Sequence, residues 1–122
     1  MSNNSIIEIL HLEQFDTEIN GDNKYILVDF YATWCGPCKK IEPDIKKLCK
    51  EYEEIKFLKV DVDKVPLLAK QYKISAMPTF LLFHKVDDTT VPTYKRIVGA
   101  DINKITNLLK STRIVICDDS LF

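Results

Sequence analysis

The fold is decided by one stretch of the sequence, residues 25–38, which reads Tyr25-Ile26-Leu27-Val28-Asp29-Phe30-Tyr31-Ala32-Thr33-Trp34-Cys35-Gly36-Pro37-Cys38. Its first eight residues form a near-continuous apolar run, typical of a strand buried on both faces of a parallel sheet. From residue 37 to 52 the apolar side chains recur at spacings of three and four, which predicts an amphipathic helix. The stretch therefore predicts a buried strand, a turn that carries two cysteines, and a long helix.

The rest of the chain alternates strands and helices and ends in a hairpin and a helix. We expect strands over residues 6–10, 55–62, 79–83 and 94–98, and helices over residues 12–19, over residues 66–72 and after Asp101. The alternation predicts a parallel sheet with helices on both faces, to which the hairpin adds antiparallel strands. The fold class is therefore α/β, with a central mixed sheet of about five strands flanked by four helices.

Composition excludes several classes of function. The 122 residues carry a net charge of −1, with Lys and Asp/Glu interspersed along the chain. A nucleic-acid-binding protein would be expected to show a basic stripe, and a membrane span needs roughly 18 consecutive apolar residues; neither is present. The N-terminal residues lack the positive charge of a secretory or mitochondrial leader. We therefore expect a cytoplasmic, monomeric protein without nucleic-acid or membrane partners.

One domain is expected over residues 1–112, followed by a C-terminal tail over residues 113–122. The tail contains the β-branched, apolar run Ile114-Val115-Ile116, and β-branched residues are poorer helix formers. Contiguous exposed apolar residues also promote association. We therefore expect residues 113–117 to be extended and docked on the domain, residues 118–122 to be looser, and Cys117 to be a partly shielded bystander.

The cysteine pair predicts redox chemistry. Cys35 and Cys38 are three residues apart at a helix start, which places their Cα atoms roughly 5 Å apart, within the range of a disulfide. The helix N-terminus favours an anion, so it should lower the pKa of the Cys35 thiol and make its thiolate the nucleophile. Cys38 lies one turn deeper, so we expect it to be less exposed and to attack second. Pro37 is tolerated in the first helical turn and stiffens the loop.

The alternative for such a pair is half of a zinc site. Four zinc ligands usually need a second close pair. The remaining candidates, Cys49, Cys117, His11 and His84, are scattered through the sequence. We therefore expect no metal and no bound cofactor. Cys49 lies on the apolar stripe of its helix and is expected to be a buried core residue.

The segment Trp34-Cys35-Gly36-Pro37-Cys38 resembles the active-site motif of thioredoxins, whereas protein disulfide isomerases usually carry Gly-His and glutaredoxins Pro-Tyr between the cysteines. The resemblance covers roughly residues 5–111. It also includes Val28-Asp29-Phe30-Tyr31-Ala32, Pro43, Leu58-Lys59-Val60-Asp61, Met77-Pro78-Thr79-Phe80 and Val98-Gly99-Ala100. The fold that it implies, a mixed sheet flanked by four helices, agrees with the order of elements inferred above.

The resemblance implies that Asp29 takes the proton of Cys38, directly or through water. Burial raises the pKa of a carboxyl group, which suits a proton carrier near neutral pH. The alternative is a partly solvated carboxylate on a strand. Lys59 either tunes Asp29 or is a plain surface lysine, and the sequence leaves both open.

The resemblance further implies a cis peptide before Pro78, in a loop that packs on the Cys35–Cys38 disulfide and blocks a metal site. The backbone of Met77 could then pair with an extended substrate peptide. The expected substrate surface around Cys35 consists of Trp34, Gly36, Pro37, Met77, Pro78, Gly99 and Ala100. Core packing is the alternative for each of them, and Trp34 is expected to be the most exposed.

The implied function is thiol–disulfide exchange in cell redox homeostasis and electron transport: the dithiol reduces disulfides in protein substrates and is recycled by an NADPH-dependent thioredoxin reductase. An oxidase or isomerase is disfavoured, because Gly-Pro between the cysteines favours the reducing end of the redox scale. A redox-independent binding module is disfavoured by the retention of Cys35, Cys38, Asp29 and Pro78.

The sequence departs from the family pattern at two places outside the cysteine motif. The segment between Phe83 and Gly99 is about five residues longer than usual, which predicts a floppy hairpin tip around residues 87–90. Tyr31 stands where bacterial thioredoxins commonly have tryptophan. We expect both departures to affect the choice of partner and neither to affect the chemistry.

Overall fold

The computed structural model describes residues 3–86 and 92–120, without the side chains of residues 114–120. The expected hairpin tip at residues 87–90 therefore lies outside the described residues. The strands are β1 (Ile7–Ile9), β2 (Tyr25–Tyr31), β3 (Ile55–Asp61), β4 (Thr79–His84) and β5 (Thr93–Val98). The helices are α1 (Leu12–Ile19), α2 (Gly36–Glu51), α3 (Pro66–Gln71) and α4 (Ile102–Ser120).

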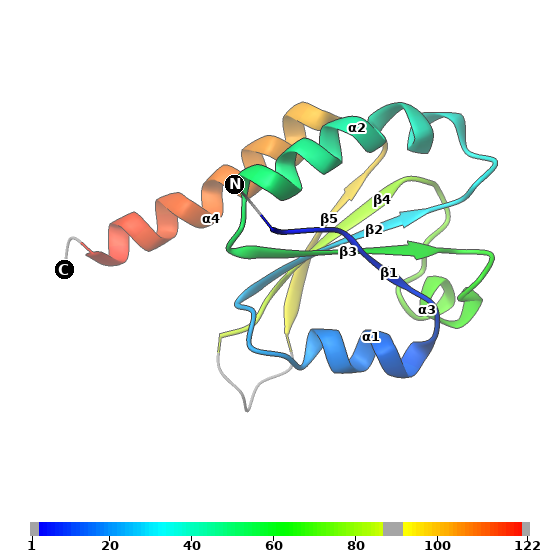
Figure 1. The fold of residues 1–122 in the computed structure, drawn as a ribbon, viewed down its shortest axis with the longest axis horizontal. Coiled ribbons are helices and arrows are strands. Elements are labelled where there is room, and N and C mark those ends of the chain that lie inside the picture. The colour runs from blue at the N-terminus through cyan, green and yellow to red at the C-terminus, as the bar shows by residue number, and fades with distance from the viewer. Residues whose placement is uncertain (1–2, 87–91, 121–122) are drawn as a thin grey trace.

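The five strands form one mixed sheet, in the order β1-β3-β2-β4-β5 (Figure 1). β3 pairs in parallel with both β1 and β2. β4 pairs antiparallel with β2 and with β5. This arrangement confirms the predicted fold class, because the alternating first part gives the parallel strands and the hairpin gives the antiparallel ones.

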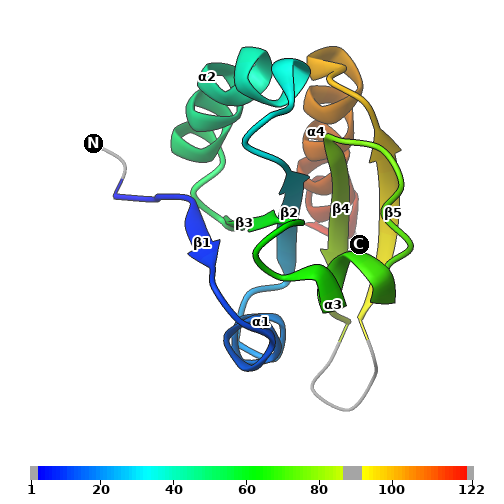
Figure 2. The same ribbon diagram turned by 90° about the vertical axis from the view of Figure 1, so that its right-hand side faces the viewer.

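Helices cover both faces of the sheet (Figure 2). α2 and α4 pack on one face in a core that includes Ile45, Leu48 and Leu109. α1 and α3 pack on the other face, where Phe15 and Leu68 are buried. Side chains of a strand alternate between the two faces, and every second residue of β2 therefore points toward α2.

The alternation of β2 decides where Asp29 lies. Tyr25 and Leu27 belong to the core under α2 and α4, whereas Ile26 and Val28 belong to the core under α1 and α3. Asp29 follows Leu27 by two residues and thus faces α2. It is paired with Lys59 of β3 on one side and with Phe80 of β4 on the other. The sheet register therefore brings together the two charged residues that the sequence singled out.

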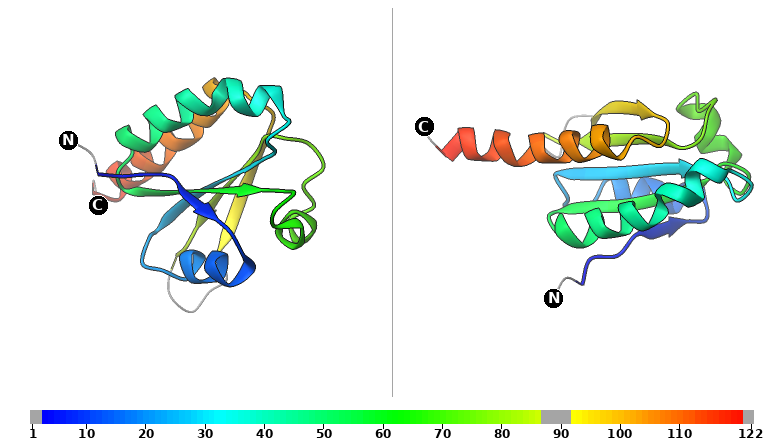
Figure 3. Two further views of the ribbon diagram at one scale, coloured as in Figure 1. Left: turned by 45° about the vertical axis from the view of Figure 1, so that its right-hand side comes forward. Right: turned by 90° about the horizontal axis from the view of Figure 1, so that it is seen from above.

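The expectation of an extended segment at residues 113–117 is wrong, because α4 continues without a break through Ser120. The last turns of α4 project beyond the sheet (Figure 3). The physical reason is cooperativity: once a helix has formed, each added residue needs no new nucleus. The helix penalty of a β-branched residue is only a few tenths of a kcal/mol up to about 0.7 kcal/mol. The boundary at residues 112/113 and the shielding of Cys117 stay predictions, since the Cys117 side chain is not described.

Arg113 holds α4 against the end of α2. Its guanidinium group stacks on the ring of Tyr52, with Cζ 3.9 Å from the ring centroid. Nε and Nη2 donate to the two carboxylate oxygens of Glu54 at 2.6 and 3.1 Å. Nη2 also donates to the Glu51 carbonyl oxygen at 2.8 Å, a carbonyl at the C-terminus of α2. One side chain thus joins α4, α2 and the turn before β3.

We expect Arg113→Ala to lower the free energy of unfolding by about 1 kcal/mol, since a partly exposed ion pair and a cation–π contact each contribute about 0.5–1 kcal/mol. Urea unfolding of the oxidised protein measures this difference. Arg113→Lys is the matched control: it keeps the charge but loses the bidentate geometry, so it should recover less than half of the loss. An Ala variant as stable as the wild type would show that this contact does not hold α4.

Candidate active site

The cysteine pair lies at the N-terminus of α2, as the sequence predicted. Cys35 is the N-cap residue, and its Sγ accepts a hydrogen bond from the Cys38 N–H at 3.2 Å. The two residues form a disulfide, with their Cα atoms 5.3 Å apart. Unpaired N–H groups and the helix dipole at this end favour a negative charge, which is the environment that the sequence predicts for the Cys35 sulfur.

The expectation that Cys38 is less exposed than Cys35 is wrong for the disulfide form, since Cys35 is 5% and Cys38 7% exposed. The loop before β4 covers Cys35: the carbonyl oxygen of Met77 lies 3.6 Å from its Sγ. Cys38 instead lines a cavity on the other side of the pair. The two sulfurs therefore differ in what they face rather than in how deeply they are buried.

Two loops lie beside the disulfide. The Met77–Pro78 peptide is cis, as the resemblance implied, and the Pro78 carbonyl oxygen accepts a hydrogen bond from the Gly99 N–H at 2.8 Å. Gly99 has φ +99°, a conformation that disfavours residues with a Cβ atom. This hydrogen bond holds the loop of Gly99 and Ala100 next to the cis-proline loop.

The surface around Cys35 is partly exposed. Trp34 is 67% exposed, and Gly36, Pro37 and Ala100 are exposed as well. Met77 and Gly99 are half-buried, and Pro78 is buried. The core-packing alternative thus fits Pro78 but not Trp34.

The Trp34 side chain has a fixed partner that sequence reasoning missed. Its Nε1 donates to Oδ2 of Asp63 at 2.8 Å. Asp63 follows β3 in the loop before α3, and its own N–H donates to Oδ1 of Asp61 at 2.9 Å. The large exposed indole is therefore held in one orientation beside the cysteines, although no pattern in the sequence links residues 34 and 63.

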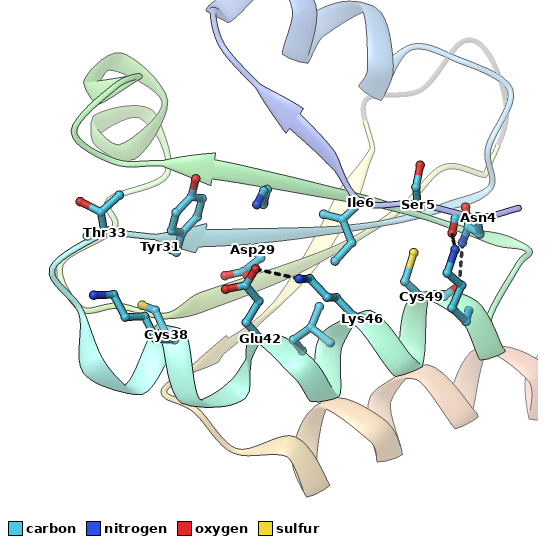
Figure 4. A pocket seen from close by; sticks show the side chains of 15 residues that line it. Asn4, Ser5, Ile6, Asp29, Tyr31, Thr33, Cys38, Glu42, Lys46 and Cys49 are labelled. Carbon is cyan, nitrogen blue, oxygen red and sulfur yellow. Dashed lines mark hydrogen bonds and ion pairs between the residues drawn. The ribbon is translucent and has the colours of Figure 1, made fainter.

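A cavity of about 520 Å³ connects Cys38 with Asp29. It lies between α2, the strands β2 and β3, and the segment at residues 4–6, and both side chains line it (Figure 4). Oδ1 of Asp29 is buried without a hydrogen-bond partner among the described residues. Burial is the main cause that raises the Asp29 pKa to about 7, and Lys59 opposes it. Asp29 is therefore a half-buried residue with one buried carboxylate oxygen, and its pKa lies close to neutral pH.

Lys59 lines the same cavity as Asp29 and Cys38. Its charge lowers the pKa of Asp29. Its Nζ lies 3.9 Å from Oε1 of Glu8 and 5.4 Å from the centre of the Tyr31 ring. The Tyr31 hydroxyl donates to the Glu8 carboxylate at 2.8 and 2.9 Å. Tyr31 also lines the cavity, and the expectation that the residue at this position does not affect the chemistry stays a prediction.

Sequence reasoning also missed Glu8 and Glu42, whose negative charges raise the pKa of Asp29. The sequence could have indicated Glu42, because it follows Cys38 by four residues in α2, and residues at that spacing share one face of a helix. No sequence pattern could have indicated Glu8, because it reaches the site only through the parallel pairing of β1 with β3, which places Glu8 opposite Lys59.

Cys49 is 1% exposed and packs in the core under α2 and α4, which confirms it as a buried core residue. Its backbone carbonyl accepts a hydrogen bond from Nδ2 of Asn4 at 2.9 Å. Within the described ranges, no three His, Cys, Asp or Glu side chains are grouped to hold a metal ion. Nor does any helix in that part of the chain combine the length and the apolar character of a membrane span.

A disulfide at a helix N-terminus, a cis-proline loop on one side of it and a half-buried carboxyl with a raised pKa on the other are the features of a dithiol–disulfide oxidoreductase. A model of the thioredoxin family matches residues 6–111, and the chain belongs to that family. It is accordingly a protein-disulfide reductase, which acts by dithiol–disulfide exchange through its active-site cysteine pair.

The relatives agree with this assignment. The chain is 41% identical over 86 residues to "Thioredoxin Asp f 28" of Aspergillus fumigatus, a match that covers 70% of this chain and 76% of that one. It is 34% identical over 106 residues to "Thioredoxin-2" of Saccharomyces cerevisiae, covering 87% and 97%. Among solved structures, oxidised mitochondrial thioredoxin 3 from Saccharomyces cerevisiae superimposes with a TM-score of 0.77 at 36% identity, covering 87% of this chain and 94% of that one.

Proposed function

We propose that this chain reduces protein disulfides with Cys35 as the attacking thiolate and Cys38 as the resolving thiol. Cys35 attacks a substrate disulfide, one substrate sulfur leaves as a thiolate, and a mixed disulfide forms. Cys38 then attacks Sγ of Cys35, the bond to the substrate breaks, and the second substrate thiol is released. The products are a reduced substrate and the Cys35–Cys38 disulfide. The observation that carries the proposal is this disulfide at the N-cap of α2.

Asp29 accepts the proton of Cys38 in this scheme. A base works best when its pKa is close to the working pH, and the pKa of Asp29, raised to about 7, meets that condition. The cavity shared by Asp29 and Cys38 has room for a water molecule between them. Lys59 tunes this base by favouring its charged form.

The substrate lies across the surface formed by Trp34, Gly36, Pro37, Met77, Pro78, Gly99 and Ala100. An extended peptide there pairs with the backbone of Met77, by the same hydrogen bonding that joins neighbouring strands. The exposed indole of Trp34, held by Asp63, supplies apolar contact area without a further loss of side-chain freedom on binding.

The oxidised chain is recycled by an NADPH-dependent thioredoxin reductase, and it acts as a monomer in the cytoplasm. One similar structure comes from a mitochondrial thioredoxin, and the mitochondrion is therefore the alternative compartment.

An insulin-reduction assay tests this function. With NADPH, a thioredoxin reductase and the full chain, NADPH should be consumed continuously as insulin disulfides are reduced. Omission of the chain or of the reductase should each stop the reaction. A chain that is reduced by dithiothreitol but by no thioredoxin reductase tried would contradict the recycling step and leave the dithiol chemistry standing.

A further inference from the structure

Glu42 lies across the cavity from the Asp29 carboxyl. Cys38, Glu42 and Lys46 follow one another at four-residue intervals and share the face of α2 that lines the cavity. Figure 4 shows the carboxyl groups of Asp29 and Glu42 directed toward each other. Lys46 Nζ lies 3.4 Å from Oε1 of Glu42, so Glu42 stands between a buried carboxyl and a solvent-exposed ammonium group.

The exposure of Glu42 differs from that of Asp29. The Glu42 side chain is 46% exposed, whereas Asp29 is half-buried and its Oδ1 is buried with no hydrogen-bond partner in the part of the chain that the structure describes. Both side chains line the cavity, through which a proton that leaves Asp29 can reach solvent. Glu42 lines the cavity and is also partly exposed to solvent.

The charged and titratable groups around Asp29 come from four elements. They are Glu8 from β1, Tyr31 from β2, Lys59 from β3, and Cys38, Lys39, Glu42, Lys46, Cys49 and Lys50 from α2. Among the described residues, α4 and β4 contribute no charged side chain to the cavity lining. Glu42 and Glu8 both raise the pKa of Asp29, with Glu42 the larger of the two, while Lys59 lowers it. Glu8 is bound to Tyr31, which leaves Glu42 as the acidic group that faces Asp29 directly.

We propose that Glu42 is a positioning residue of the dithiol reaction, a second carboxylate that keeps the proton at Asp29 exchangeable with solvent at neutral pH. The inference rests on the proposed role of Asp29 as the proton acceptor. When Cys38 attacks Sγ of Cys35, its proton passes to Asp29 and then, by way of the cavity beside Glu42, to water. No bond other than those of the disulfide exchange is made or broken.

Glu42→Gln tests the proposal, because the amide keeps the shape of the side chain and removes its charge. The first readout is the titration of the Asp29 carboxyl carbon by NMR in the oxidised protein, which needs no activity. The midpoint should fall by about half a unit to one unit, as expected for the loss of one negative charge across a partly solvated gap. Asp44→Asn is the matched control: it removes the same charge from α2, but Asp44 does not line the cavity, so the midpoint should stay within about 0.2 units.

The second readout is the rate of resolution, followed by the fluorescence of Trp34, the sole tryptophan, at saturating substrate. Its pH profile should shift in Glu42→Gln by as much as the Asp29 midpoint. Lys46→Met should move both midpoints upward, since it removes the positive charge beside Glu42.

Superimposable profiles of Glu42→Gln, Asp44→Asn and the wild type would overturn the proposal, as would a shifted Asp29 midpoint with an unshifted rate profile. Failure of the proposed function can be told apart from failure of this proposal, because the wild type itself would then show no resolution phase.

Discussion

Replacement of Cys35 by serine is expected to reduce the protein-dependent rate of disulfide reduction, after subtraction of the rate without protein, at least a thousandfold. A serine hydroxyl is not ionised at neutral pH, and it cannot form the mixed disulfide through which the reaction passes. Effects of this size, about three powers of ten or more, are typical of the loss of a catalytic nucleophile. The insulin assay with dithiothreitol as the reductant measures the change.

Cys49→Ala is the matched control for this substitution. Cys49 is a free thiol in the same helix and lines the same cavity, but it lies three turns from the disulfide. Its removal should leave the rate within about twofold of the wild type and lower stability by about 1 kcal/mol, as the loss of a small buried side chain does. Substantial activity in Cys35→Ser, or its loss in Cys49→Ala, would place the nucleophile elsewhere.

The second large effect concerns Asp29 and the pH dependence of stability. The folded protein holds the pKa of Asp29 near 7, against an ordinary value of 3.8. Below pH 3.8 the carboxyl is neutral in both the folded and the unfolded chain, and its contribution to stability is fully present. As pH rises toward 7 the unfolded chain ionises first, so this contribution is lost, by up to about 4 kcal/mol above pH 7.

Asp29→Asn removes that loss because an amide does not ionise. The free energy of unfolding of the variant minus that of the wild type should therefore grow by up to about 4 kcal/mol between pH 4 and pH 8. Urea unfolding of the two oxidised proteins measures this difference in the free energy of unfolding. Titratable residues that both proteins share contribute equally to each value and therefore cancel. In the same variant, mixed-disulfide formation should be nearly unchanged and its resolution slowed. A stability difference that is flat with pH would mean that Asp29 is ionised without penalty.

The position of Asp29 could be predicted because it depends on local rules. The apolar run of residues 25–32 predicted a buried strand, and a period of two placed Asp29 on the same face as Leu27. The spacing of Cys35 and Cys38 likewise predicted their Cα separation, since it follows from helix geometry alone. The boundaries of the helices and strands were predicted to within a few residues for the same reason, with the exception of α4.

The features that the sequence did not predict depend on contacts between distant segments. Trp34 meets Asp63 only because the loop after β3 approaches the start of α2. Glu8 meets Tyr31 and Lys59 through the pairing of β1 with β3. The length of α4 was predicted wrongly for another reason. The low helix propensity of the β-branched residues is a small effect, and the cooperativity of a helix that has already formed outweighs it. Arg113 also holds this helix on the domain.

The central claim is that Cys35 alone makes the covalent bond to substrate and that Cys38 breaks it. The most direct measurement is mass spectrometry of the complex that Cys38→Ser forms with an oxidised protein substrate, after proteolysis without reductant. We expect a stable mixed disulfide that joins the substrate to the peptide containing Cys35. We also expect that no such complex accumulates with the wild type, in which Cys38 resolves it. A substrate bound to Cys49 or Cys117, or an equal yield of complex from the wild type and Cys38→Ser, would contradict the account.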